Sequence, residues 1–332
     1  METAGGWISM VDSIIRSQRP VHRVKYFILL FFALAPGSIG ARAQDSPRIN
    51  SESLLSHIQK LSSDEFEGRL AGSESGFKTQ KYLIDAFSGI GLPVCASEYR
   101  QEFEIRGRQE GLEGANILGL IRGSSENTDI IILSAHFDHL GIRGGMIFNG
   151  ADDNASGTAA LIEIAAYFLE NPLAHSLLIA AFDAEESGLQ GAGAFLQNPC
   201  VEVDRISIII NMDMISRSQS SELYASGTFH YPPLKEILTN MDAPENIHLL
   251  FGHDLPDTGS DDWTLASDHG PFFQRGIPYL YFGVEEHEGY HNPSDDFENI
   301  TLPFYVNAVE LLVDVIIEVD NNMDMVKALR QP

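Results

Sequence analysis

Three continuous apolar runs constrain the fold of this chain more than any other feature. They are Ser176–Phe182 (SLLIAAF), Arg205–Ile210 (RISIII) and Ile277–Phe282 (IPYLYF). A strand with one wet face alternates apolar and polar residues, whereas a strand that is covered on both faces reads as continuous apolar sequence. These runs therefore predict strands near the centre of a sheet that carries helices on both faces.

Helical patterns alternate with these strands. The clearest is Asn154–Glu170, which repeats apolar residues on one face and begins at asparagine, a good helix-capping residue. Alternating strands and helices predict one α/β domain from about residue 50 to the C-terminal end. The other elements we predict are helices at Ser51–Leu61, Phe77–Phe87 and Thr301–Val319, and strands at Tyr99–Ile105, Ala115–Ile121 and Asp129–Ala135.

The first 43 residues are predicted to be a secretory signal peptide. A basic run precedes the apolar stretch YFILLFFALA (residues 26–35), and ARA (residues 41–43) is a small-x-small cleavage site. The stretch is too short to span a bilayer, which takes about 20 apolar residues. We expect cleavage after residue 43, a short mature segment at residues 44–50, export to the periplasm or the medium, and no stable membrane association. Either Met1 or Met10 can be the start.

Charge and cysteine content narrow the possible partners. The chain has 47 acidic and 21 basic residues, a net charge of −26, which is the wrong sign for nucleic-acid binding. The cysteines are Cys95 and Cys200, which do not form a zinc-binding pair motif. Export would permit a disulfide, but the sequence leaves open whether the two residues are bridged.

Acidic and histidine residues gather at the ends of the predicted strands, where open α/β sheets bind their ligands. Imidazole and carboxylate together suit zinc, and one catalytic zinc usually takes three protein ligands. A larger set can hold two metals if one carboxylate bridges them. The segments are His136–His139 (HFDH), Gly150–Gly157 (GADDNASG), Asp183–Gly188 (DAEESG), Asn211–Ile215 (NMDMI) and Tyr290–Asp296 (YHNPSDD).

In this order the segments resemble the co-catalytic zinc exopeptidases of metallopeptidase family twenty-eight, which include the bacterial leucyl aminopeptidases. The resemblance extends from Glu65–Gly76 (EFEGRLAGSESG) to the C-terminal helix. It implies a single three-layer α/β domain over residues 51–332, with a mixed, mostly parallel sheet flanked by helices. It leaves no room for an inserted protease-associated domain.

The resemblance also implies a ligand set for two zinc ions per chain. His136 and Asp213 would hold one zinc, and Glu186 and His291 would hold the other. Asp152 would bridge the two ions, and relatives have a cis peptide bond directly after the bridging aspartate.

Further roles follow from the same resemblance. Glu185 matches the general base, and Asp138 matches the carboxylate that orients His136. Tyr290 would line the substrate site. Some histidines have no counterpart and are expected to be surface or supporting residues: His139, His269 and His287.

These features predict a secreted, zinc-dependent hydrolase of peptides, an aminopeptidase that uses metal-activated water with Glu185 as general base. Alternatives are a carboxypeptidase or dipeptidase of the same fold, a glutaminyl cyclase-like enzyme, which typically has one zinc, and a metal-free binding ectodomain. Candidate carboxylates for the substrate's ammonium group are Asp261, Asp262 and Glu288. The sequence leaves open the side-chain preference, the native metal and the oligomeric state.

Overall fold

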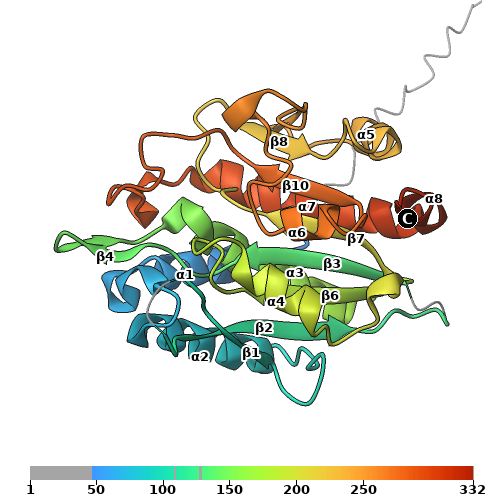
Figure 1. Cartoon of the computed structure of the whole chain (residues 1–332). Coiled ribbons are helices and arrows are strands. Elements are labelled where there is room, and N and C mark those ends of the chain that lie inside the picture. Colours follow the sequence, from blue (N-terminus) through green and yellow to red (C-terminus); the bar gives the residue numbers. More distant parts are fainter. Residues whose placement is uncertain (1–46, 108–109, 127–128, 332) are drawn as a thin grey trace, which may run out of the picture. The chain divides into compact units, whose positions relative to one another are not determined.

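The computed structural model describes residues 47–107, 110–126 and 129–331 (Figure 1). The predicted signal peptide and its cleavage site lie outside the described residues. Within the described residues, no helix combines the length and the apolar character that crossing a membrane requires.

One large mixed sheet forms the centre of the described residues, with eight strands in the order β1-β2-β6-β3-β7-β10-β8-β9. Strands β6, β3, β7 and β10 run parallel to one another, whereas β2 and β8 are antiparallel to their inner neighbours. The bounds are β1 (Arg100–Glu104), β2 (Glu113–Ile121), β3 (Ile130–His136), β6 (Ser176–Phe182), β7 (Ile206–Met212), β8 (Glu222–Ser226), β9 (His248–Phe251) and β10 (Tyr279–Gly283).

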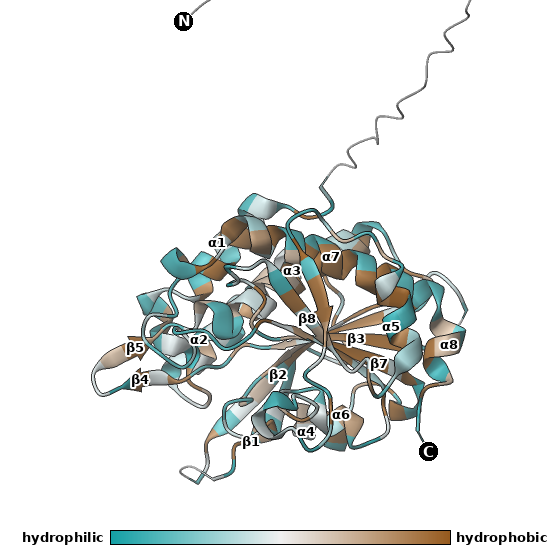
Figure 2. Cartoon of the chain, turned by 90° about the horizontal axis from the view of Figure 1, so that it is seen from above, coloured by the Kyte–Doolittle hydropathy of each residue, from teal (hydrophilic) through white to brown (hydrophobic). Residues whose placement is uncertain are grey.

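Helices cover both faces of this sheet. Figure 2 shows α1, α3 and α7 above the apolar strands and α4 and α6 below them. The helices are α1 (Ser51–Leu61), α2 (Glu74–Gly89), α3 (Gly157–Glu170), α4 (Gln190–Gln197), α5 (Pro232–Thr239), α6 (Gly270–Phe273), α7 (Leu302–Asn321) and α8 (Met323–Lys327). Short helical turns lie at η1 (Asp64–Arg69), η2 (Ala151–Ser156), η3 (Val203–Arg205), η4 (Gly259–Asp261) and η5 (Phe297–Asn299).

The predicted fold class is confirmed. Every residue of β3, β6 and β7 is buried, which is why these strands read as continuous apolar sequence. The strands that the sequence did not predict, β8, β9 and the hairpin strands β4 (Gly141–Arg143) and β5 (Met146–Phe148), are short and partly exposed. A short strand with mixed burial has too little apolar sequence to give a periodic signal.

The long central helix begins later than predicted. Asp153 and Asn154 have non-helical backbone angles, and α3 starts at Gly157. The Asn154 side chain still caps the helix, because its Oδ1 accepts a hydrogen bond of 2.9 Å from the Gly157 N–H. This departure from helical geometry lies next to the acidic residues that the sequence singled out.

A disulfide joins Cys95 and Cys200, whose Cα atoms are 5.9 Å apart. It connects the segment before β1 to the segment after α4 and closes a sequence separation of 105 residues. The pairing that the sequence left open is therefore present in the structure.

Candidate metal centre

The acidic and histidine side chains meet at one edge of the sheet, where parallel strands end. Strands β6, β3 and β7 are neighbours, so the residues at their carboxyl ends come together although they are distant in sequence. The contributing residues are His136 from β3, Glu185 and Glu186 after β6, Asp213 after β7, His291 after β10, and Asp153 from η2.

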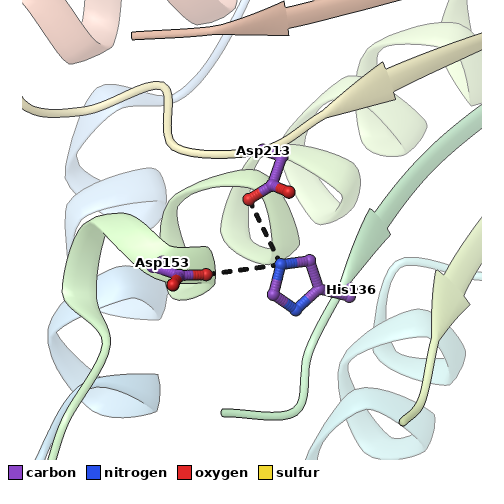
Figure 3. Close-up of side chains that lie close together, drawn as sticks. All are labelled: His136, Asp153 and Asp213. Carbon is purple, nitrogen blue, oxygen red and sulfur yellow. Dashed lines mark hydrogen bonds and ion pairs between the residues drawn. The ribbon is translucent and has the colours of Figure 1, made fainter. Parts of the chain in front are cut away.

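The first ligand group consists of His136, Asp153 and Asp213, all buried (Figure 3). His136 Nε2 lies 3.2 Å from Asp213 Oδ1 and 3.4 Å from Asp153 Oδ1. His136 Nδ1 lies 3.1 Å from the Asp138 carbonyl oxygen, which can only accept, so Nδ1 carries the proton. Nε2 is therefore the ring nitrogen that faces the two carboxylates and is available to a metal there.

The second ligand group lies on the other side of Asp153. His291 Nε2 is 3.2 Å from Asp153 Oδ2 and 3.4 Å from Glu186 Oε1. His139 completes a further set of potential ligand atoms with Asp153 and Glu186. Asp153 thus presents Oδ1 to the first group and Oδ2 to the second, as a bridging carboxylate does.

The prediction that Asp152 bridges is wrong. The Asp152 side chain is fully buried, and its hydrogen-bond partners are Ser216 and His287 rather than members of the ligand groups. Its Oδ1 accepts hydrogen bonds from the Ser216 N–H (2.7 Å) and hydroxyl (2.8 Å), and its Oδ2 lies 2.9 Å from His287 Nε2. The non-proline cis peptide bond is Asp153–Asn154 and not Asp152–Asp153, so it again follows the aspartate shared by the two groups.

Glu185 lies beside the first group and is tied to Asp138. The Glu185 N–H donates to Asp138 Oδ1 at 2.9 Å, and the same oxygen is 3.8 Å from His136 Nδ1. Burial raises the pKa of the Glu185 carboxyl well above its usual range, and the nearby charge of Asp213 adds to this, although His136 opposes it. Asp138 therefore connects the backbone of Glu185 to the loop that carries His136.

Polar atoms in this cluster are buried without hydrogen-bond partners among the described residues. They include Asp138 Oδ2, Glu186 Oε1 and both ring nitrogens of His139. Carboxylates and imidazoles buried in this way are costly unless a cation or another partner compensates them. The set of nitrogen and oxygen donors fits zinc, which binds both and tolerates three protein ligands at a catalytic site.

Arg69 binds the backbone of two loops that carry members of the cluster, a role that was not predicted from the sequence. Its fully buried guanidinium donates to the carbonyl oxygens of Phe137 (2.8 Å), Asn149 (2.6 Å) and Gly150 (2.8 Å). Burial lowers the pKa of Arg69 to about 10, against the opposing charge of Asp153. One side chain thus joins the loop of His136 to the loop of Asp153. The only feature of the sequence that could have indicated this role is a single arginine in the glycine-containing segment EFEGRLAG.

Asp295, from the fifth acidic segment, also holds the Asp153 loop. Its carboxylate accepts hydrogen bonds from the N–H groups of Asp152 and Asp153, each at 3.0 Å. Burial raises the pKa of Asp295 to about 6, and the charge of Asp152 acts in the same direction. Asp295 therefore fixes the backbone of the loop and is not part of either ligand group.

The remaining residues with predicted roles surround the cluster. Tyr290 stacks on His291 with ring centroids 4.0 Å apart, so its ring lies next to the second group. His269 is fully buried away from solvent, and its Nε2 lies 2.9 Å from the Trp263 carbonyl. Three non-glycine residues beside the cluster have left-handed backbone angles, as strained functional sites often do: Ala184, Met214 and His291.

A cavity of about 420 Å³ adjoins the Asp152 loop. His287, which contacts Asp152, lines it together with Tyr224 and Arg217. Its other lining residues are mostly acidic or polar: Glu222, Glu285, Glu286, Glu288, Ser218, Gln219 and Ser220. Three carboxylates were expected to receive the ammonium group of a substrate, and of these Glu288 lines this cavity. The other two have partners elsewhere: Asp261 lies 2.8 Å from His253 Nδ1, and Asp262 accepts a hydrogen bond from the Thr264 N–H.

Residues 116–316, more than half of the chain, match the family model for Peptidase family M28. The chain belongs to peptidase family M28. The matched region includes every ligand and base candidate described above and excludes Arg69. Membership confirms the resemblance that the five acidic segments predicted.

Relatives and solved structures agree with membership in the M28 family. Aminopeptidase YwaD of Bacillus subtilis is 30% identical over 220 residues, which cover 61% of this chain and 44% of YwaD. The zinc aminopeptidase BSAP from Bacillus subtilis has a TM-score of 0.63 at 18% identity, over 82% of this chain and 96% of that one. A glutaminyl cyclase from Porphyromonas gingivalis has a TM-score of 0.66 at 20% identity, and the similarity covers 82% of this chain and 99% of the cyclase. The chain thus spans less than half of YwaD, and the structural similarities establish the fold.

Proposed function

We propose that this chain is a zinc-dependent exopeptidase that removes residues from the amino terminus of peptides. His136 and Asp213 would hold one zinc ion, Glu186 and His291 would hold a second, and Asp153 would be shared by the two. The observation that carries the proposal is the position of Asp153, whose Oδ1 is 3.4 Å from His136 Nε2 and whose Oδ2 is 3.2 Å from His291 Nε2. One carboxylate between two imidazoles is the arrangement expected of a residue shared by two metal ions.

Glu185 is the proposed general base. When bound, a zinc pair would polarise the scissile carbonyl and lower the pKa of a coordinated water. The Glu185 carboxylate accepts the proton of the attacking water and returns it to the leaving amine. Asp138 positions Glu185 by accepting its backbone N–H at 2.9 Å. The Glu185 side chain needs no metal contact for this role, which separates it from the adjacent Glu186.

Attack at the amino end is supported by the acidic surroundings of the cluster. Glu222, Glu285 and Glu288 line the adjoining cavity, with Arg217 as its one cationic lining residue among those described. This excess of carboxylates attracts a substrate ammonium group and repels a substrate carboxylate. The effect must be local, because charges more than about 8 Å apart are largely screened at physiological salt. The name of YwaD, an aminopeptidase, supports the same direction.

We also propose that the protein is exported after removal of residues 1–43. The disulfide between Cys95 and Cys200 supports this, because such bonds persist mainly in oxidising compartments.

A panel of peptides with zinc restored tests the proposal. Each peptide is supplied free, acetylated at the amino terminus and amidated at the carboxyl terminus, and the products are identified by mass spectrometry. We expect acetylation nearly to abolish hydrolysis and amidation to change it little. Faster cleavage of the acetylated peptide would instead favour a carboxypeptidase, and pyroglutamyl products would favour the cyclase whose fold this chain shares. Wild-type protein that is active with one tightly held metal would contradict the two-zinc assignment.

A further inference from the structure

His139 lies inside the second ligand group, although the sequence gave it no role. Its side chain is fully buried at the end of the HFDH segment. The Nδ1 atom is 2.8 Å from Glu186 Oε1 and 3.6 Å from Asp153 Oδ2. These are the same two carboxylates that face His291 Nε2, at 3.4 and 3.2 Å. The two imidazoles thus approach one pair of carboxylates.

The contact between His139 and Glu186 is close but does not have the alignment of a good hydrogen bond. Both ring nitrogens of His139, and Glu186 Oε1, lack a hydrogen-bond partner among the described residues, despite the approach of 2.8 Å. A buried polar atom without a partner is costly, so three such atoms in one place call for a compensating group. The lone pairs of His139 Nδ1 and Glu186 Oε1 are thus both free to bind one cation placed between them.

The ring of His139 is held in this orientation by the backbone of the Asp153 loop. A Cβ atom at Gly150 would lie 2.5 Å from His139 Cδ2, and Gly150 has a φ of +57°. Glycine is therefore needed where the imidazole packs, both for space and for backbone conformation. The backbone at Gly150 therefore packs directly against one side of the His139 ring.

We propose that His139 Nδ1 is a fourth protein ligand of the second metal, together with Asp153, Glu186 and His291. This inference rests on the proposed two-zinc function. It makes the two sites chemically unequal, because the second then has two imidazoles and the first has only His136. Nitrogen donors favour zinc over the harder ions magnesium and manganese. The second site should accordingly bind zinc more tightly and retain it longer under a chelator.

Cadmium-113 NMR of the full chain tests this inference, because each bound ion gives a resonance that depends on its nitrogen donors. Wild-type protein reconstituted with two cadmium ions should give two resonances. In His139→Gln, one resonance should move toward the position of the other, because its site loses one imidazole. Zinc affinity of that site, measured by chelator competition, should fall at least about tenfold. The exposed His248→Gln is the matched control and should leave both resonances and both affinities unchanged.

The outcomes separate the possible roles of His139. Lower affinity with both resonances in their wild-type positions would mean that His139 only orients Glu186, and would overturn the inference. Unchanged affinity and resonances would also overturn it. A wild-type protein that binds fewer than two ions would instead contradict the two-metal function itself. Circular dichroism of the metal-free variants checks folding, and His139→Ala, which removes the ring from its contact with Gly150, decides the question if His139→Gln fails to fold.

Discussion

The carboxylates of Asp152 and Asp153 face different partners although the residues are adjacent. Asp152 Oδ1 accepts the Ser216 N–H at 2.7 Å, whereas Asp153 Oδ1 and Oδ2 lie 3.4 Å from His136 and 3.2 Å from His291. Asp152 therefore anchors its loop to the segment after β7, and Asp153 presents the same loop to the ligand groups. The two side chains point to different partners where the backbone at Asp153 departs from helical geometry.

Substituting the two aspartates separately tests this division. Asp153→Asn should weaken binding at both metal sites, because it removes the negative charge of the bridge and one of its two oxygens. Asp152→Asn should retain both metals and lower the free energy of unfolding by about 1–3 kcal/mol, because Oδ1 can still accept from Ser216 but an amide NH2 replaces the buried Oδ2 that contacts His287 Nε2. Metal content after gel filtration and urea unfolding measure the two effects. Metal loss in Asp152→Asn with full occupancy in Asp153→Asn would restore the original assignment.

The sequence could predict the cluster of candidate ligands but not which of the two adjacent aspartates lies between the ligand groups. The apolar strand Ser176–Phe182 was predicted to the residue, because burial on both faces leaves a continuous signal. The resemblance named His136 and Asp213, and the structure brings them to 3.2 Å. It assigned the bridge to the wrong one of two consecutive aspartates, because the direction of each side chain depends on backbone angles that the motif does not specify.

Residues outside the motifs were harder to predict for a different reason. Arg69 precedes the first ligand by 67 positions, and its partners are backbone carbonyls, which leave no sequence signal. His139 lies within a motif, but its role depends on the packing of Gly150 against its ring. Both contributions are properties of the folded loops and not of a local pattern.

Replacing each of the two adjacent glutamates by glutamine in turn should distinguish the general base from the metal ligand. Glu185→Gln removes a proton acceptor and no proposed metal ligand, so it should retain both metals while turnover falls by about 10²–10⁴. Glu186→Gln should weaken the second metal, because Glu186 Oε1 lies 3.4 Å from His291 Nε2. Stopped-flow turnover and metal analysis of the same samples distinguish the two variants. If Glu185→Gln loses metal and Glu186→Gln keeps it, the two roles are reversed.

Replacing Arg69 by lysine should loosen the metal-binding loops. The guanidinium reaches Phe137, Asn149 and Gly150 with separate N–H groups, and a lysine ammonium cannot reproduce that planar fork. We expect the free energy of unfolding to fall by about 3 kcal/mol or more, as in other broken buried networks, and zinc affinity to fall with it. Arg330→Lys is the control, since Arg330 donates to Val203 and Ile206 away from the cluster. Arg330→Lys should lower the free energy of unfolding without changing zinc affinity. If Arg330→Lys also lost zinc, general destabilisation alone would explain the loss of zinc in Arg69→Lys.

Removing the disulfide should destabilise the protein without altering metal binding. The bond joins Cys95 to Cys200 across 105 residues, and a loop of about that length is worth roughly 4–5 kcal/mol in the chain-entropy description. The double variant Cys95→Ala/Cys200→Ala should show this loss in urea unfolding under oxidising conditions. Added reductant should shift the wild type toward the variant and leave the variant unchanged. An equal response of both proteins to reductant would show that the bond does not contribute.

His269 should make the stability of the protein sensitive to mild acid. Burial lowers the pKa of this imidazole to about 4 in the folded state, from 6.5, although its hydrogen bond to the Trp263 carbonyl opposes the shift. Between these values the unfolded chain binds the proton more readily than the folded chain. The stabilising contribution is therefore complete above about pH 6.5 and is lost as the pH falls toward 4. A shift of this size corresponds to about 3 kcal/mol.

The contribution of His269 is isolated by comparing two variants with the wild type. His269→Gln keeps a donor for the Trp263 carbonyl, and His269→Phe keeps a ring against Tyr279, whose centroid is 4.6 Å away. Neither variant titrates in this range, so the free energy of unfolding of each should fall less than that of the wild type between pH 6.5 and 4. Measurements on metal-free protein in a chelator remove the effect of protons on the metal ligands. Parallel curves for all three proteins would show that His269 is already protonated, or still accessible to protons, in the folded state.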